Sequence, residues 1–266
     1  MQYKCLSIAG FDGSGGAGLQ ADLKTFSALG CYGMTVLTAL PVQNTMGVRH
    51  CYDIPLKAIL DQLEALFDDI VPDSIKIGML FKREIVLLVA DFLSERAIGI
   101  PIVLDPVMMA KSGDHLLMPE AIHALKSRLI PMATLITPNL PEAYALTEST
   151  DEMPLLAEQL LALGPHAVLL KGGHQDGPSS DDLFMDQGGQ NTWLKSPRIQ
   201  SKNTHGTGCT LSSAIAAYLA RGFPLVNACE RAKIYLTNAL AAAQHASVGH
   251  GQGPVHHFHK LWPIKT

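Results

Sequence analysis

The sequence predicts an α/β protein whose mostly parallel central sheet is flanked by helices on both faces. Short apolar stretches rich in β-branched residues alternate with longer amphipathic stretches along most of the 266 residues, as in repeated strand–helix units. Apolar residues make up 47% of the chain and charged residues 17%, so the chain can bury a large core. Such sheets bind ligands beyond the carboxyl ends of their strands. We therefore expect a single domain over residues 1–266 with its site at that edge.

The alternation can be followed from one element to the next. We expect strands at residues 4–9, 33–40, 48–53, 74–79, 101–105, 134–137 and 167–171. We expect helices at residues 19–30, 55–69, 83–96, 119–130, 153–163, 207–221 and 224–246, and a short helix that opens at Pro141. The alternation stops over residues 181–200, where Gly188 and Gly189 join two short strand-like stretches and predict a small antiparallel ribbon.

Composition argues against several functional classes. The formal net charge is -4 and basic runs do not exceed pairs such as Lys82-Arg83, so the clustered cations that bind nucleic acid are missing. No apolar run approaches the roughly 20 residues of a membrane span, and the first apolar run is too short for a signal peptide. The five cysteines are widely spaced and lack a Cys-x-x-Cys pair, which favours a reduced, cytoplasmic location.

Candidate site residues follow nearly every predicted strand. They are Asp12, Gln43, Met79, Asp105, Asn139 with Glu142, and Lys171. A lone carboxylate after a strand is usually a turn or cap residue, but parallel strands bring all their carboxyl ends to one edge. The recurrence therefore favours a binding site there.

A glycine turn within residues 203–213, NTHGTGCTLSS, opens a predicted helix. Gly206 and Gly208, on either side of Thr207, leave the N–H groups at the helix start accessible to an anion, and the helix dipole favours its negative charge. Cys209 lies in the first helical turn, where the pKa of a thiol is lowered, so it could act as a base or nucleophile. An ordinary turn before a buried helix, with Cys209 in the core, explains the same residues equally well.

Two further candidates also have two interpretations each. Asn139 and Glu142 are about one helical turn apart, and with Asp105 they could hold Mg²⁺, which needs few protein oxygens when water and phosphates complete its shell. A helix cap explains that spacing too, and spacing alone favours the cap. Lys171, before two glycines, is either a contact for a transferring phosphate or a solvated lysine.

A dinucleotide-binding fold is the main rival on motif grounds. Gly13, Gly15 and Gly18 satisfy G-x-G-x-x-G between a strand and a helix. The rival also needs an acidic residue about 20 positions later, after the second strand. That strand ends near Gln43, and Asp22 lies too early, within the first helix. NAD binding is therefore disfavoured, and a G-x-x-x-x-G-K-[ST] loop is missing from the sequence.

The longer motifs together resemble one known family. AGFDGSGGAGLQADLKTFSALG, TALPVQNT, KIGML, LDPVM, ITPNLPEA, LLKGGH, NTHGTGCTLSSA and GPVHHFH are similar to the hydroxymethylpyrimidine/phosphomethylpyrimidine kinases of thiamine synthesis, which have the ribokinase-like fold. The resemblance spans residues from about 5 to 260. It implies an enzyme that uses ATP and Mg²⁺ to phosphorylate 4-amino-5-hydroxymethyl-2-methylpyrimidine to its monophosphate and then to the diphosphate. It also implies a homodimer.

The resemblance also implies roles for individual residues. Gln43 would read the aminopyrimidine, because an amide offers both a donor and an acceptor, and Met79, Asp22 and Gly10 would lie around the ring. Lys171, Asn139 and Thr207 would bind ATP, and Glu142 and Asp105 would bind the metal. Gly206, Thr207 and Gly208 would form the anion hole, and Cys209 would act as the base, with Lys171 also serving in catalysis.

The turn departs from the wider ribokinase-like group, in which most sugar kinases have GTGD instead of GTGC. A phosphate monoester, the nucleophile of the second transfer, is already largely dianionic at neutral pH and needs no base. A permanent carboxylate would repel it, whereas Cys209 can be neutral. A pyridoxal kinase of the same fold, and more remotely a phosphopyrimidine sensor without catalysis, stay as alternatives.

Overall fold

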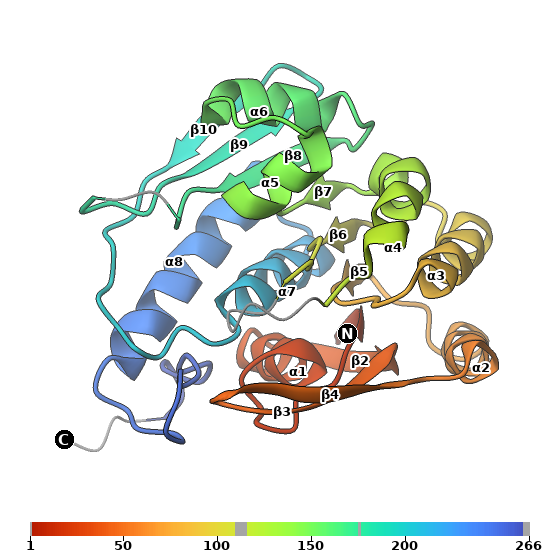
Figure 1. The fold of residues 1–266 in the computed structure, drawn as a ribbon, viewed down its shortest axis with the longest axis horizontal. Helices are drawn as coiled ribbons and strands as arrows, with labels where there is room; N and C mark the ends of the chain where they lie inside the picture. The colour runs from red at the N-terminus through yellow and green to blue at the C-terminus, as the bar shows by residue number, and fades with distance from the viewer. Residues whose placement is uncertain (1, 110–115, 175–176, 263–266) are drawn as a thin grey trace.

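An eight-stranded sheet crosses the molecule in the computed structural model, which describes residues 2–109, 116–174 and 177–262 (Figure 1). The strand order is β10-β9-β8-β7-β6-β5-β1-β2. The parallel strands are β1 (Tyr3–Ala9), β2 (Cys31–Leu37), β5 (Ser74–Ile77), β6 (Ile102–Leu104), β7 (Leu135–Ile136) and β8 (Ala167–Lys171). Most of these strands are short apolar runs buried on both faces, as expected for a parallel sheet covered on both sides.

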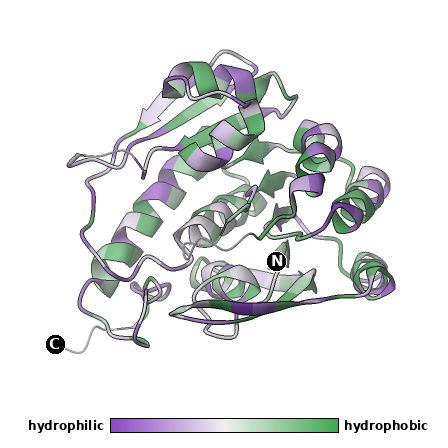
Figure 2. Ribbon diagram, in the orientation of Figure 1, coloured by the Kyte–Doolittle hydropathy of each residue, from purple (hydrophilic) through white to green (hydrophobic). Residues whose placement is uncertain are grey.

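Helices cover both faces of this sheet, which confirms the predicted fold class. One face carries α2 (Leu56–Phe67), α3 (Arg83–Arg96), α4 (Pro119–Ala124), α5 (Leu140–Thr147) and α6 (Met153–Leu161). The other face carries α1 (Gly18–Ala28), α7 (Thr207–Ala220) and α8 (Leu225–Ala243). Figure 2 shows strongly hydrophobic central strands, whereas the helices mix hydrophobic and hydrophilic residues, as helices with one buried side do.

The strand expected over residues 33–40 is two strands instead of one. β2 ends at Leu37, and β3 (Ala39–Asn44) pairs antiparallel with β4 (Gly47–Asp53) in a separate two-stranded sheet. Thr38 makes the break, because its N–H donates to Ala9 O at 3.0 Å and its Oγ1 donates to Met79 O at 2.6 Å. These tertiary hydrogen bonds turn the chain within an apolar run that shows no interruption in the sequence.

The antiparallel ribbon predicted over residues 181–200 is confirmed, and the structure places it at the edge of the central sheet. β9 (Asp182–Asp186) and β10 (Asn191–Leu194) do pair antiparallel, but β9 also pairs with β8, so the ribbon extends the central sheet. Four successive β9 residues are buried, as in an interior strand. The small antiparallel sheet that stands apart is β3–β4.

The helix predicted over residues 119–130 ends as α4 at Ala124 and continues as a π turn (Leu125–Leu129) and a 3-10 turn (Ile130–Met132). Pro131 has no N–H for another helical turn. In the described part of the chain, no helix combines the length and the apolarity that crossing a membrane requires.

The strand order reverses at β1, which lies between β2 and β5. In open α/β sheets such a reversal leaves a crevice outside the carboxyl ends of the adjacent strands. Gly10 directly follows β1 and Met79 is the second residue after β5, and a β-carbon built on Gly10 would lie 2.9 Å from the Met79 sulfur. The fold therefore brings these two segments into contact at one end of a cavity.

Candidate active site

A cavity of about 660 Å³ runs along the carboxyl ends of the strands. Its lining includes all of the expected site residues except Asp12 and Asp22: Gly10, Gln43, Met79, Asp105, Asn139, Glu142, Lys171, Gly206, Thr207, Gly208 and Cys209. These residues come from seven separate segments of the chain. The sheet edge and the start of α7 therefore converge on one space, and the interpretation of Cys209 as a sealed core residue is excluded.

The glycine turn before α7 has the backbone of an anion cradle. Gly206 is left-handed with φ 76°, and a β-carbon there would lie 1.8 Å from the carbonyl oxygen of Gly16. Only glycine allows this contact between two backbones. α7 begins at Thr207, and the first N–H groups of a helix have no intrahelical acceptor. The cradle is thus held in place by the loop that precedes α1.

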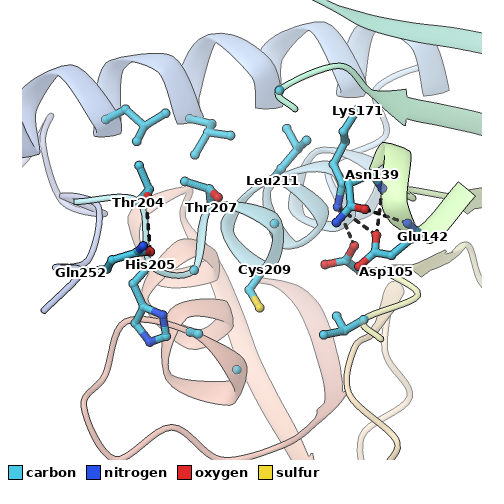
Figure 3. Close-up of a pocket in the computed structure, with 18 of the residues that line it drawn as sticks. Asp105, Asn139, Glu142, Lys171, Thr204, His205, Thr207, Cys209, Leu211 and Gln252 are labelled. Carbon is cyan, nitrogen blue, oxygen red and sulfur yellow. Dashed lines mark hydrogen bonds and ion pairs between the residues drawn. The ribbon is translucent and has the colours of Figure 1, made fainter. Parts of the chain in front are cut away.

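Lys171 lies directly beside this cradle (Figure 3). Its Nζ is 2.9 Å from Asp105 Oδ1 and 3.9 Å from Glu142 Oε2. A β-carbon on Gly208 would lie 3.5 Å from the same nitrogen. Burial lowers the pKa of Lys171, but the Asp105 and Glu142 carboxylates outweigh it and raise the pKa above its ordinary value. The ammonium is therefore permanently charged where an anion would bind.

Asn139 and Glu142 form a helix cap, as their spacing favoured. Asn139 Oδ1 accepts from Glu142 N at 2.9 Å, and Asn139 N donates to Glu142 Oε2 at 2.8 Å. Burial raises the pKa of Glu142 to about 7 against the opposing charge of Lys171. Asp105 is also buried and accepts from Thr137 Oγ1 at 3.0 Å. The cap does not account for the whole arrangement, because two buried carboxyl groups, Asp105 and Glu142, also lie near Lys171.

These carboxylates suit a hard cation that is completed by other ligands. No group of three or more His, Cys, Asp or Glu residues with metal-binding geometry occurs among the described residues. Asp105 and Glu142 nevertheless both line the cavity, and two carboxylates with water and phosphate oxygens satisfy Mg²⁺. The donor set therefore fits Mg²⁺ delivered with a phosphate and does not form a complete protein-only metal site.

The predicted lowering of the Cys209 pKa is wrong for this structure. Burial raises the pKa of Cys209 to about 11, and the Asp22 and Asp105 carboxylates raise it further. The Lys76 ammonium and the N–H of Gly18 oppose this shift. The position of Cys209 at the start of α7 does not decide its pKa, because the charges of two acids distant in the sequence also act on the thiol. Cys209 is thus a neutral thiol near pH 7.

Comparison with known proteins identifies the family. The model of the phosphomethylpyrimidine kinase family matches residues 12–256. The chain belongs to this family. It is 52% identical over 267 residues to the hydroxymethylpyrimidine/phosphomethylpyrimidine kinase of Escherichia coli (strain K12), covering 98% of this chain and 99% of that one.

Two further relatives of this phosphomethylpyrimidine kinase family member extend the comparison. The thiamine biosynthesis bifunctional protein ThiED of Geobacter sulfurreducens is 49% identical over 256 residues, 95% of this chain and 51% of that one. The solved pyridoxal kinase from Staphylococcus aureus in complex with ADP has a TM-score of 0.89 and 35% identity, covering 98% of this chain and 95% of that chain. These similarities confirm the expected ribokinase-like fold.

Within this family member, Asp22 lies beneath the cavity and not in its wall. Its side chain is fully buried and accepts from Ser7 Oγ at 2.5 Å and Ser213 Oγ at 2.6 Å. It also pairs with Lys76 Nζ at 2.8 Å. The expected position of Asp22 beside a substrate ring is therefore not what the structure shows.

The sequence reasoning missed several functional candidates in the cavity of this kinase-family chain. Lys76 lies in the apolar strand SIKI, where a lysine gave no signal of a site. His205 is bound by Asp12, with His205 Nε2 2.8 Å from Asp12 Oδ2. Lys233 pairs with Asp182 at 2.7 Å. The His205 and Lys233 pairs join segments distant in the sequence, so only the fold reveals them.

Proposed function

We propose that this chain phosphorylates 4-amino-5-hydroxymethyl-2-methylpyrimidine with ATP, first to the monophosphate and then to the diphosphate, in thiamine biosynthesis. The observation that carries the proposal is one cavity lined by Lys171, Gly208, Cys209 and Gln43. Membership of the phosphomethylpyrimidine kinase family supports the reaction class. The relatives' names support the substrate and the pathway.

Gln43, Met79 and Gly10 are proposed to hold the pyrimidine. Gln43 Nε2 donates to the carbonyl oxygen of Phe11 at 3.5 Å, which is a long hydrogen bond, and a ring nitrogen could accept from Nε2 in place of that oxygen. Met79 contributes a polarisable wall beside Gly10, which lacks a side chain. This end of the cavity thus offers an amide for the polar edge of the ring and a flat space for its face.

Lys171, Thr207 and Asn139 are proposed to act on the ATP phosphates, with Glu142 and Asp105 toward Mg²⁺. Mg²⁺, when bound with ATP, would neutralise phosphate charge. Lys171 contributes a fixed positive charge and the Gly206–Gly208 turn contributes N–H donors, which is where phosphoryl transfer gains most of its stabilisation. Apolar side chains that include Ile199, Leu236 and Leu240 line the same cavity and would cover a flat purine base.

The two transfers differ in what they require of Cys209. In the first, the substrate oxygen attacks the γ-phosphorus, the bond from phosphorus to ADP breaks, and the hydroxyl proton moves to the Cys209 thiolate. In the second, the nucleophile is a phosphate oxygen that carries no proton to remove. A thiol with a pKa of about 11 is neutral during the second transfer and adds no repulsion.

The deciding experiment follows ATP consumption with hydroxymethylpyrimidine, its monophosphate and pyridoxal in separate reactions. We expect both pyrimidines to be phosphorylated with higher kcat/KM than pyridoxal. The structural similarity to a pyridoxal kinase makes pyridoxal the relevant competitor. Higher kcat/KM for pyridoxal would contradict the proposal, and binding of the monophosphate without ATP consumption would indicate the sensor.

A homodimer, a cytoplasmic location and a single domain are also proposed. All five cysteines are free in the structure, which is compatible with a reducing compartment. One sheet extends from β2 near the N-terminus to β10, which supports a single domain. Sedimentation velocity at several concentrations tests the dimer, and a monomer throughout would contradict it.

A further inference from the structure

A fully buried ion pair lies under the candidate site without a role in the proposed reaction. Lys76 on β5 and Asp22 on α1 are both unexposed, and their charged atoms are 2.8 Å apart. Asp22 is further fixed by the hydroxyls of Ser7 and Ser213. A buried ion pair often stabilises a fold no better than apolar residues of similar volume would. Its presence therefore calls for an explanation other than stability.

The ion pair is connected to Cys209 through α7, which carries both Cys209 and the Ser213 that binds Asp22. Ser213 follows Cys209 by four residues, so both side chains lie on one face of that helix, and Ser213 holds Asp22 there. Lys76 lines the same cavity as Cys209. The Lys76 charge lowers the pKa of Cys209, while Asp22 and Asp105 raise it.

We propose that Lys76 and Asp22 are positioning residues that set the proton affinity of the Cys209 sulfur for the first transfer. Lys76 places a positive charge beside the thiolate before it receives the hydroxyl proton, and Asp22 limits that effect by neutralising Lys76. Asp22 thus acts through Lys76 and does not touch the pyrimidine. This inference rests on the proposed function, because it explains how the Cys209 side chain can accept a proton as a thiolate in the first step and stay a neutral thiol in the second.

The test measures Cys209 directly, by the rate of alkylation with iodoacetamide between pH 6 and 11. Cys51→Ser serves as the background, because Cys51 is the other cysteine that is not fully buried, and Cys209→Ser gives the blank. We expect the pH profile of alkylation to move upward in Lys76→Met, so that the rate at pH 9.5 falls by about tenfold, and downward in Asp22→Asn, so that the rate at pH 9.5 rises by about tenfold. At pH 7.5 the first transfer should slow in Lys76→Met by about tenfold, with a smaller change in the second.

The opposite signs separate this role from a merely structural one. Shifts in the same direction, or no shift in either variant, would overturn the inference. If one variant fails to fold by circular dichroism, the double variant Lys76→Met/Asp22→Leu removes both charges, and its rate at that pH should lie between those expected for the single variants. Alkylation needs no substrate. Opposite shifts in a protein that does not phosphorylate the pyrimidine would therefore refute the proposed function, with the role in the first transfer, and leave only the influence of Lys76 and Asp22 on the Cys209 thiol.

Discussion

Lys171 is the residue whose charge the site can least replace. Its ammonium lies near the buried carboxyl groups of Asp105 and Glu142 and beside the cradle at Gly208. We expect Lys171→Ala to lower kcat in both transfers by about 10²–10³-fold, because the phosphate charge loses a fixed partner in either step. Steady-state assays with each pyrimidine measure this. Lys195→Ala, at an exposed lysine, is the matched control, and a change confined to the pyrimidine KM would contradict the assignment.

Cys209 gives a prediction that distinguishes the two transfers. Cys209→Ser should slow the first transfer by about 10²–10⁴-fold and the second by less than about tenfold, since only the first requires a base. In the unmodified enzyme the first kcat should rise with pH between 7 and 9, because the thiolate fraction grows below a pKa of about 11. The second should stay flat there, since its phosphate ionises near pH 6. Equal losses in both transfers would count against the base.

At the scale of individual residues, the sequence predicted which residues line the cavity better than it predicted their chemistry. Cys209 and Lys171 stand out because glycines precede Cys209 and follow Lys171 in the sequence. The direction of the Cys209 pKa was wrong because it depends on Asp22 and Asp105, which only folding brings near. Lys76 was missed because a lysine within an apolar strand has the same pattern whether or not it faces a site.

At the scale of elements, the turn before α7 contains two glycines with different constraints. Gly206→Ala places a methyl group against the backbone of Gly16 at a left-handed position, which costs about 1–2 kcal/mol in strain even without the clash. Gly208→Ala meets Asp105 Oδ2 at 3.4 Å and Lys171 Nζ at 3.5 Å, which are ordinary contacts.

We therefore expect the two alanine variants to separate folding from activity. Gly206→Ala should lower the melting temperature and the rates of both phosphoryl transfers. Gly208→Ala should keep the melting temperature, or raise it by the equivalent of at most about 1 kcal/mol, while its methyl group obstructs the cradle and lowers both transfers by about tenfold or more. Calorimetry combined with the two assays measures this, and full activity in Gly208→Ala would exclude the cradle.

The C-terminal segment is attached to α7 by a buried histidine. His257 Nε2 is 3.1 Å from Thr210 Oγ1, and Tyr235 Oη donates to the His257 carbonyl oxygen at 2.7 Å. Burial lowers the pKa of His257 to about 3, so the folded state holds it neutral. Its contribution to stability is fully present above pH 6.5 and is lost as the pH falls below that value.

His257 should therefore make the protein sensitive to acid. We expect its share of the free energy of unfolding to fall by about 2 kcal/mol between pH 6.5 and pH 5. Urea unfolding of His257→Gln should show a smaller pH dependence over this range. His245→Gln, at an exposed histidine, should keep the dependence of the parent protein. An unchanged dependence in His257→Gln would contradict the assignment.

The elements themselves were largely predictable because strand–helix alternation is a local property. α3 and β8 have the bounds that their sequence patterns predicted. The break at Thr38 and the pairing of β9 with β8 were not predictable, since both depend on hydrogen bonds to residues distant in the sequence.

At the scale of the molecule, one sheet joins nearly the whole chain, and we expect it to unfold in a single cooperative step. The two tryptophans report on separate regions, since Trp193 lies on β10 and Trp262 stacks on Phe258 near the C-terminus. Trp193→Phe and Trp262→Phe each leave one fluorescent reporter. Both should give the same melting temperature as circular dichroism at 222 nm, and two distinct temperatures would contradict a single domain.

The shared cavity constrains the order of events across both transfers. On the proposed assignment, the phosphate delivered in the first round would end beside Lys171 and Gly208, where the next γ-phosphate would also have to bind. The monophosphate would then have to dissociate before another ATP could enter. The two transfers would be separate binding events, and the released intermediate would be available to any other protein that binds it.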